Sequence, residues 1–126
     1  MDTQLTQDLV RRYFCRLLND RDLSVCDELL APDYVDHDAP QGAPPGPQNT
    51  KAFVAQFLDD HPNMHVTVED ILAEPNKAAA RLIWTGTNRH TGVKLHQMGI
   101  VIVHLNEKGQ IAERWSAYAP LAKGGK

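Results

Sequence analysis

The segment MHVTVEDILA, residues 64–73, decides the fold, because the spacing of apolar residues changes there. Met64, Val66 and Val68 alternate with polar residues, and a period of two is typical of a strand with one buried face. Upstream of Pro62, apolar residues recur instead at spacings of three and four, the period of an amphipathic helix. The sequence therefore predicts a helical first half followed by a β-sheet.

Three helices are predicted in the first half. The first covers residues 4–19, where apolar residues return every three or four positions. A second, short helix starts near Asp22, which can cap a helix N-terminus, and Pro32 closes it. The third has Pro47 in its first turn and ends at residues 61–62, a His-Pro pair. The first two helices are expected to form a hairpin.

The region between the second and third helices is expected to hold part of a site. A short extended piece over residues 34–38 leads into residues 39–49, which contain four prolines and two glycines. This composition predicts a loop that is either an ordered rim or a mobile lid.

Strands fill the rest of the chain. After residues 64–73, the alternating pattern predicts strands over residues 78–87, 94–105 and 110–119, joined by turns. The strand 94–105 is apolar on both faces between Ile100 and Val103, so both of its sides should be covered. A second subunit is one candidate for such a cover.

Length and composition describe one globular domain over residues 1–126. A chain of this size buries enough surface to form a core with an internal pocket. Hydrophobic residues at 42% and charged residues at 23% are typical of globular proteins, which excludes the disordered class. The net charge of −3, with both signs interspersed, argues against nucleic acids and anionic membranes as partners.

The sequence predicts a cytoplasmic address. The longest apolar runs, such as residues 100–103, are far shorter than the roughly 20 residues that cross a bilayer. The N-terminus, MDTQ, is acidic where an export signal is basic. Cys15 and Cys26 occupy apolar helix positions, so each is expected to be a buried, unreactive thiol.

The predicted fold class is α+β, a cone-shaped roll in which the three N-terminal helices pack on a strongly curved antiparallel sheet. Such a cone encloses an apolar pocket, and concave apolar sites with few polar groups bind small molecules. We therefore expect the functional site inside the cone.

The densest cluster of titratable groups is Asp36-His37-Asp38. A histidine between carboxylates gains basicity and can act as a general base near neutral pH. An aspartate at the apolar entrance of a pocket can act in the same way. Strand alternation puts Asp36 and Asp38 on one side and His37 on the other, so a regular segment cannot point all three into one cavity. The alternative is a solvated loop start with His37 bonded to the backbone.

Several large side chains are candidates for the pocket wall, with plain core packing as their alternative. They are Tyr13, Phe57, Trp84, Met98, Trp115 and Tyr118. His104 interrupts an apolar strand and is a further candidate for chemistry, with a structural role as its alternative.

A metal site is not expected. His61 and His65 are four residues apart, but Pro62 lies between them, so they cannot share a helical face as a zinc-binding pair does. The sequence also has no phosphate-binding glycine motif and no Gly-x-Ser-x-Gly nucleophile turn.

Short sequence motifs occur in a characteristic order over nearly the whole chain. They are LNDRDL (18–23), LAPDYVDHD (30–38), GP (46–47), VEDILAE (68–74), AAR (79–81), WTGT (84–87), TG (91–92) and GQIAERW (109–115). In order and spacing they resemble the SnoaL-like polyketide cyclase family, within the nuclear-transport-factor-2-like and ketosteroid-isomerase-like fold.

This resemblance implies a small cofactor-free enzyme that binds an apolar, often polycyclic substrate, moves protons by acid–base chemistry and forms a homodimer through the sheet. It places the family's histidine at His37, the carboxylate base of ketosteroid isomerases at Asp38 and a histidine of the preceding strand near His104. Two positions differ from the relatives. The isomerases' oxyanion-hole tyrosine falls at Phe14, and the cyclases' acid–base aspartate falls at Ala119.

The leading hypothesis is a homodimer that catalyses cofactor-independent cyclisation, isomerisation or hydration of an apolar, carbonyl-bearing molecule. His37, oriented by Asp36 or Asp38, is expected to act as the base, and His104 to polarise a carbonyl. A non-catalytic ligand-binding module is the alternative, motivated by the two missing groups. A dimerising scaffold with a filled cone is the third reading.

Overall fold

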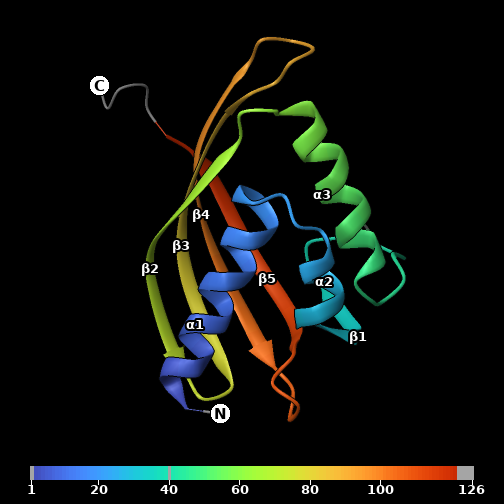
Figure 1. Ribbon diagram of the computed structural model, residues 1–126, viewed down its shortest axis with the longest axis vertical. Coiled ribbons are helices and arrows are strands. Elements are labelled where there is room, and N and C mark those ends of the chain that lie inside the picture. The colour runs from blue at the N-terminus through green and yellow to red at the C-terminus, as the bar shows by residue number, and fades with distance from the viewer. Residues whose placement is uncertain (1, 40, 122–126) are drawn as a thin grey trace.

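Apart from one strand that precedes the last helix, helices come first and strands follow, as the change of apolar spacing predicts (Figure 1). The computed structural model describes residues 2–39 and 41–121. The elements are α1 (Thr3–Phe14), a π-helical turn η1 (Cys15–Asn19), α2 (Ser24–Leu29), β1 (Leu30–Asp36), α3 (Gln48–Asp60), β2 (His65–Glu74), β3 (Lys77–Thr87), β4 (Lys94–Leu105) and β5 (Ile111–Pro120). None of these helices is long and apolar enough to cross a membrane.

The five strands form one curved sheet in the order β1-β5-β4-β3-β2. Strands β2 to β5 pair antiparallel with their sequence neighbours, as predicted. Strand β1 instead pairs parallel with β5 at the edge, so the sheet is mixed rather than purely antiparallel. The α+β class is confirmed, and the parallel edge brings the Asp36-His37-Asp38 segment beside β5.

Two predicted boundaries in the first half are wrong. The second helix ends at Leu29 and β1 begins at the next residue, so Pro32 lies within a strand instead of closing a helix. An edge strand tolerates proline because one side of its backbone needs no partner. The third helix begins at Gln48, with Pro47 as its N-cap rather than in its first turn. In the predicted loop over residues 39–49, position 40 lies outside the described residues.

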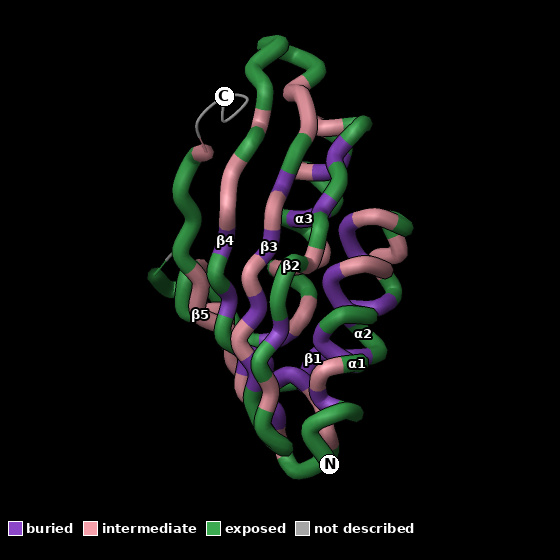
Figure 2. The backbone as a smooth tube through the Cα atoms, turned by 90° about the vertical axis from the view of Figure 1, so that its left-hand side faces the viewer, coloured by how far each residue is buried: buried purple, intermediate pink, exposed green. Residues whose placement is uncertain are grey.

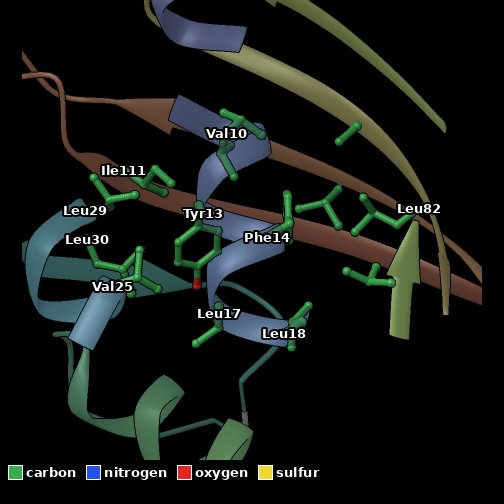
Figure 3. Close-up of a cluster of buried hydrophobic side chains, with 14 of the residues drawn as sticks. Val10, Tyr13, Phe14, Leu17, Leu18, Val25, Leu29, Leu30, Leu82 and Ile111 are labelled. Carbon is green, nitrogen blue, oxygen red and sulfur yellow. The ribbon is translucent and has the colours of Figure 1, made fainter. Parts of the chain in front are cut away.

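The helices gather on one side of the sheet (Figures 1 and 2). The buried apolar residues of α1 and η1 point into the core, where Tyr13 lies beside residues of α2 and Phe14 lies toward Leu82 of β3 (Figure 3). Cys26 is fully buried in this core, and burial raises the pKa of its thiol to about 11, consistent with an unreactive cysteine.

Two polar side chains fix the helical half to the sheet. The amide of Asn19 donates to the carbonyl of Val66 (2.9 Å) and accepts from its N–H (2.8 Å), which pairs η1 with β2. Arg21, in the left-handed conformation (φ 58°), donates to the carbonyls of Leu58, His61 and Pro62 at the end of α3. The Arg21 contacts thus add side-chain donors to carbonyls at and just after the end of α3.

The two faces of the sheet differ in surroundings. The inner face turns toward the helices, and Ala80, Leu82 and Trp84 of β3 are buried there. The open face carries the alternate residues, and no described helix covers it (Figure 2). On this face Ile100 and Ile102 of β4 are 39% and 41% exposed, so only one side of this predicted two-sided strand is covered by the chain itself.

Candidate functional site

A cavity of about 820 Å³ lies between the helices and the inner face of the sheet. Its wall includes residues from α1, η1, β1, α3, β3, β4 and β5 and from the loop that precedes α3. Leu17 and Leu18, neighbours in the π-helical turn, both line it. The predicted concave apolar pocket is therefore present. The alternative hypothesis, a cone filled by its own side chains, is wrong.

One part of the wall is aromatic. Phe57 of α3 stacks on Phe53 with ring centroids 6.1 Å apart, and its edge meets Trp84 of β3 at 5.9 Å. Trp84 in turn meets Tyr118 of β5 at 5.7 Å in an edge-to-face arrangement. Phe53 is 70% exposed, so this aromatic row reaches from the solvent into the cavity. It offers flat apolar surfaces that a ring-bearing ligand can contact.

A glycine permits the contact between Trp84 and Tyr118 in this aromatic row. A Cβ atom added to Gly99 of β4 would lie 2.5 Å from a ring carbon of Tyr118 and 3.3 Å from Nε1 of Trp84. Any side chain at position 99 therefore forces the Tyr118 ring to move.

The other part of the wall is charged and centres on Arg114 of β5. Its Nη1 lies 3.3 Å from both carboxylate oxygens of Asp36 and 3.3 Å from Oδ2 of Asp38. Its Nη2 donates to the Tyr118 hydroxyl, and the Ser116 hydroxyl donates to Asp38 Oδ2. The carboxylates are thus held at fixed positions in the cavity wall.

The backbone explains how these charges come together. The parallel pairing of β1 with β5 sets Asp36 directly beside Arg114. The pairing extends one residue further, because the N–H of His37 donates to the Arg114 carbonyl (2.9 Å). The chain then turns, with the Asp38 N–H donating to Asp36 Oδ1 (2.9 Å). Asp36 and Asp38 therefore share one side, as strand alternation predicts.

Burial sets the electrostatics of the wall. Burial works to lower the pKa of Arg114, but the neighbouring groups, led by Tyr118 and Asp36, together raise it by more, so the guanidinium is firmly charged. Burial also raises the pKa of Tyr34, against the lowering effect of Arg114, and raises the pKa of Tyr13, with Tyr34 adding to the rise. Both phenols are therefore neutral hydrogen-bond donors at neutral pH.

Two buried donors in the wall have no hydrogen-bond partner among the described residues. They are the Tyr34 hydroxyl and the Trp84 indole N–H. The Thr50 side chain lies near enough to Tyr34 to lower its pKa, but it makes no hydrogen bond of acceptable geometry. Buried donors without partners are uncommon because they lose hydration without compensation, and ligand sites are one place where they persist.

The structure separates the predicted catalytic side chains. Asp36 and Asp38 line the cavity, whereas His37 and His104 lie on the open face. There, His37 Nε2 is 3.0 Å from one carboxylate oxygen of Glu113, and His104 Nδ1 is 3.8 Å from the other. The Trp115 ring stacks on His37 at 4.5 Å and meets His104 edge-on at 4.7 Å.

The predicted wall residues divide in the same way. Tyr13, Phe57, Trp84 and Tyr118 line the cavity, but Met98 and Trp115 do not. Met98 pairs with Ala119, and Trp115 with Ile102, in a register that places all four on the open face. Ala119 therefore lies outside the cavity, and its lack of a polar group does not change the cavity wall. Phe14, the other position that differs from the relatives, does line the cavity.

Sequence reasoning missed Arg114, Ser116, Tyr34 and Phe53, all of which line the cavity. A signal existed for the first two, because they share the strand parity of Tyr118 and so face the same side.

One group of three potential metal ligands occurs in the part of the chain that the structure describes. It consists of Asp59, Asp60 and His90, none of which lines the cavity. The Arg89 guanidinium lies 3.1 Å from Asp59, and His90 Nε2 lies 3.2 Å from Asp60, so the group is a surface ion-pair cluster.

Solved structures share this architecture. TsrD from Streptomyces laurentii is 21% identical with a TM-score of 0.83, covering 94% of this chain and 90% of its own. IdmH, a putative polyketide cyclase from Streptomyces antibioticus, is 25% identical with a TM-score of 0.75, covering 90% and 91%. A putative polyketide cyclase from Bacillus cereus is 28% identical with a TM-score of 0.73, covering 87% and 71%.

No curated protein matches the chain. The family model of the SnoaL-like polyketide cyclases matches residues 8–122, which is most of the sequence. Because that match spans the helices, the sheet and the cavity wall, the chain belongs to the SnoaL-like polyketide cyclase family.

Proposed function

We propose that the cavity binds an apolar, carbonyl-bearing small molecule and that Asp38 transfers a proton on it, without a cofactor, to drive a cyclisation or an isomerisation. The observation that carries this proposal is a carboxylate fixed in the wall of a large apolar cavity, where two of the lining residues also carry buried donors without partners. Base and donors together are what proton abstraction beside a carbonyl requires.

Asp38 is a better base than Asp36 on geometric grounds. The Asp36 side chain is 24% exposed, and Arg114 and the Asp38 N–H bind its oxygens. The Asp38 side chain is 39% exposed, and its contacts with Arg114 and Ser116 both use Oδ2. Asp38 thus keeps one oxygen for a substrate proton.

The proposed step balances without an oxidant or reductant. Asp38 takes a proton from the carbon next to the ligand's carbonyl, and the electron pair of that C–H bond moves onto the carbonyl oxygen as an enolate. The enolate oxygen accepts a hydrogen bond from the Tyr34 hydroxyl or the Trp84 indole. Protonated Asp38 then returns the proton, either to another carbon of the enolate or to the alkoxide formed when the enolate attacks a second carbonyl.

Exchange of α-protons tests the step without knowledge of the natural substrate. NMR in D₂O measures how fast 2-tetralone exchanges its α-protons, after quenching of tryptophan fluorescence has confirmed that it binds. Wild-type protein should accelerate exchange over buffer, and Asp38→Asn should lower this acceleration by about 100-fold or more. A wild-type rate no faster than that of Asp38→Asn would sink the proposal.

The matched control is His37→Gln, because His37 is the neighbouring residue and lies on the open face. It should keep the wild-type exchange rate within about threefold. The earlier expectation that His37 is the base predicts the reverse outcome for the two variants.

A ligand-binding module without catalysis is the second candidate, favoured by Phe14, which supplies no hydroxyl to the cavity wall. It predicts that 2-tetralone binds to the wild type and to Asp38→Asn with equally slow exchange in both.

We further propose that the open face joins two copies of the chain. Ile100 and Ile102 are exposed in the middle of the sheet, and large apolar side chains gathered on an open surface mark interfaces. Sedimentation should give the mass of a dimer for the wild type and of a monomer for Ile102→Glu.

A further inference from the structure

The charges that line the cavity do not cancel. Among the described residues of its wall, Asp36, Asp38 and Arg114 are the charged ones. Two carboxylates against one guanidinium leave one negative charge in a space otherwise lined by apolar, aromatic and neutral polar side chains. Because apolar walls screen charges less than water does, a ligand's own charge is felt strongly there.

Arg114 is a poor binding partner for an anionic ligand, because its Nη atoms are already engaged. Its Nη1 contacts three carboxylate oxygens, and its Nη2 donates to the Tyr118 hydroxyl. A ligand carboxylate near Arg114 would compete with these groups and would also meet the negative charges of Asp36 and Asp38.

Asp38, in contrast, can accept a hydrogen bond from a ligand. Its Oδ2 accepts from Arg114 and Ser116, while its Oδ1 has no hydrogen-bond partner within residues 2–39 and 41–121. The residue lines the cavity and its side chain is 39% exposed. A ligand group that donates a hydrogen bond, above all a cationic one, therefore has an acceptor ready.

We propose that the cavity selects its ligand by charge: it takes ring-bearing molecules whose polar head donates to Asp38, protonated amines most tightly and neutral alcohols less so, and it rejects carboxylates. The aromatic row from Phe53 to Tyr118 holds the ring, and the excess negative charge discriminates among the heads. This inference rests on the proposed function in one respect, the assignment of the cavity as the ligand site.

Three naphthalene derivatives with heads of similar size test the selection. Calorimetry at neutral pH and low salt compares 2-(2-naphthyl)ethylamine, 2-(2-naphthyl)ethanol and 2-naphthylacetic acid. The amine should bind at least about tenfold more tightly than the acid, with the alcohol between them. Added salt should narrow the difference.

Two charge-removing variants locate the effect. Asp38→Asn neutralises the cavity and removes the free carboxylate oxygen, so the preference for the amine over the acid should shrink to about threefold or less. Glu113→Gln removes one negative charge from the open face of the same strand and should leave the preference unchanged. If Asp38→Asn fails to fold by circular dichroism, Asp36→Asn replaces it, because it removes the same charge from the cavity.

Each outcome is decisive. Binding of the acid as tightly as the amine, or a preference that both cavity variants retain, would overturn the charge selection. Asp38-dependent exchange of 2-tetralone would survive that result, so the two proposals fail separately. Failure of all three naphthalenes to bind would overturn the charge selection, and if 2-tetralone also failed to bind, the cavity would be overturned as a ligand site and both proposals with it.

Discussion

The inner and open faces of the sheet carry similar chemistry in different surroundings. On the inner face, two carboxylates flank Arg114 beside Tyr118, and on the open face two histidines flank Glu113 against Trp115. Consecutive residues of β5 supply the two centres, Glu113 and Arg114. The first cluster borders a cavity, whereas the second lies on a face that no other described part of the chain covers, so what differs is the space available to a ligand.

This comparison teaches that a dense cluster of titratable residues does not by itself mark a site. His37 and Asp38 are adjacent in the sequence, yet strand alternation gives one to the open face and the other to the cavity. A group near an apolar cavity acts on whatever enters it, whereas the half-exposed contact of His37 with Glu113 lies outside the cavity wall.

The largest expected effect that separates the faces is on stability. Arg114 is 15% exposed and joins Asp36 and Asp38, so Arg114→Gln leaves two carboxylates close together without a cation. It should lower the free energy of unfolding by about 3 kcal/mol. Glu113→Gln on the open face should change it by less than about 1 kcal/mol. Urea denaturation measures both, and equal losses would contradict the assigned difference between the faces.

A smaller effect is expected from steric crowding. Gly99→Ala puts a methyl group against the Tyr118 ring, which must shift and so disturbs its contacts with Trp84 and Arg114. Overpacking of this kind costs roughly 2 kcal/mol and should also weaken the binding of 2-tetralone. Ala117→Ser adds one atom to the open face and should cost less than about 0.5 kcal/mol. Unchanged stability and binding in Gly99→Ala would show that the aromatic row is not held as described.

The smallest effect concerns alkaline pH. All three tyrosines line the cavity, and burial raises the pKa of Tyr34 above its unfolded value of about 10. The folded state thus holds this proton longer, so the stabilisation is complete below about pH 10 and is lost as pH rises further. Tyr34→Phe should leave stability at neutral pH unchanged, because the hydroxyl has no partner, and should flatten the alkaline decline. A decline of the same slope in both proteins would rule out Tyr34 as its source.

Much of the fold could be predicted because it depends on local patterns. The switch at residue 64 and the alternation in β3 are properties of neighbouring residues, and both are confirmed. The parallel pairing of β1 with β5 was not predictable in this way, because it joins Asp36 to Arg114 across most of the chain. An arginine on a strand normally indicates a solvent-facing position, so its strand parity with Tyr118 was the only local signal that marked Arg114 as part of a site.

The candidate site was half predictable for the same reason. Trp115 and Tyr118 were both expected in the wall, yet they are three residues apart, and a regular strand turns such residues to opposite faces. Which face is the inner one depends on register, and a slip of one residue exchanges them. Only the pairing of β5 with β4 resolves this, by setting Trp115 against Ile102 on the open side.

The chain's two tryptophans allow the most direct test of the central claim, that ligand binds at the inner face and not at the open one. Trp84 lines the cavity and Trp115 lies on the open face, so their indole N–H signals in a ¹H–¹⁵N NMR spectrum report the two faces separately. Substitution of each tryptophan by phenylalanine assigns the signals. On addition of 2-tetralone, the Trp84 signal should shift and the Trp115 signal should stay in place. A shift of Trp115 with Trp84 unmoved would contradict the claim.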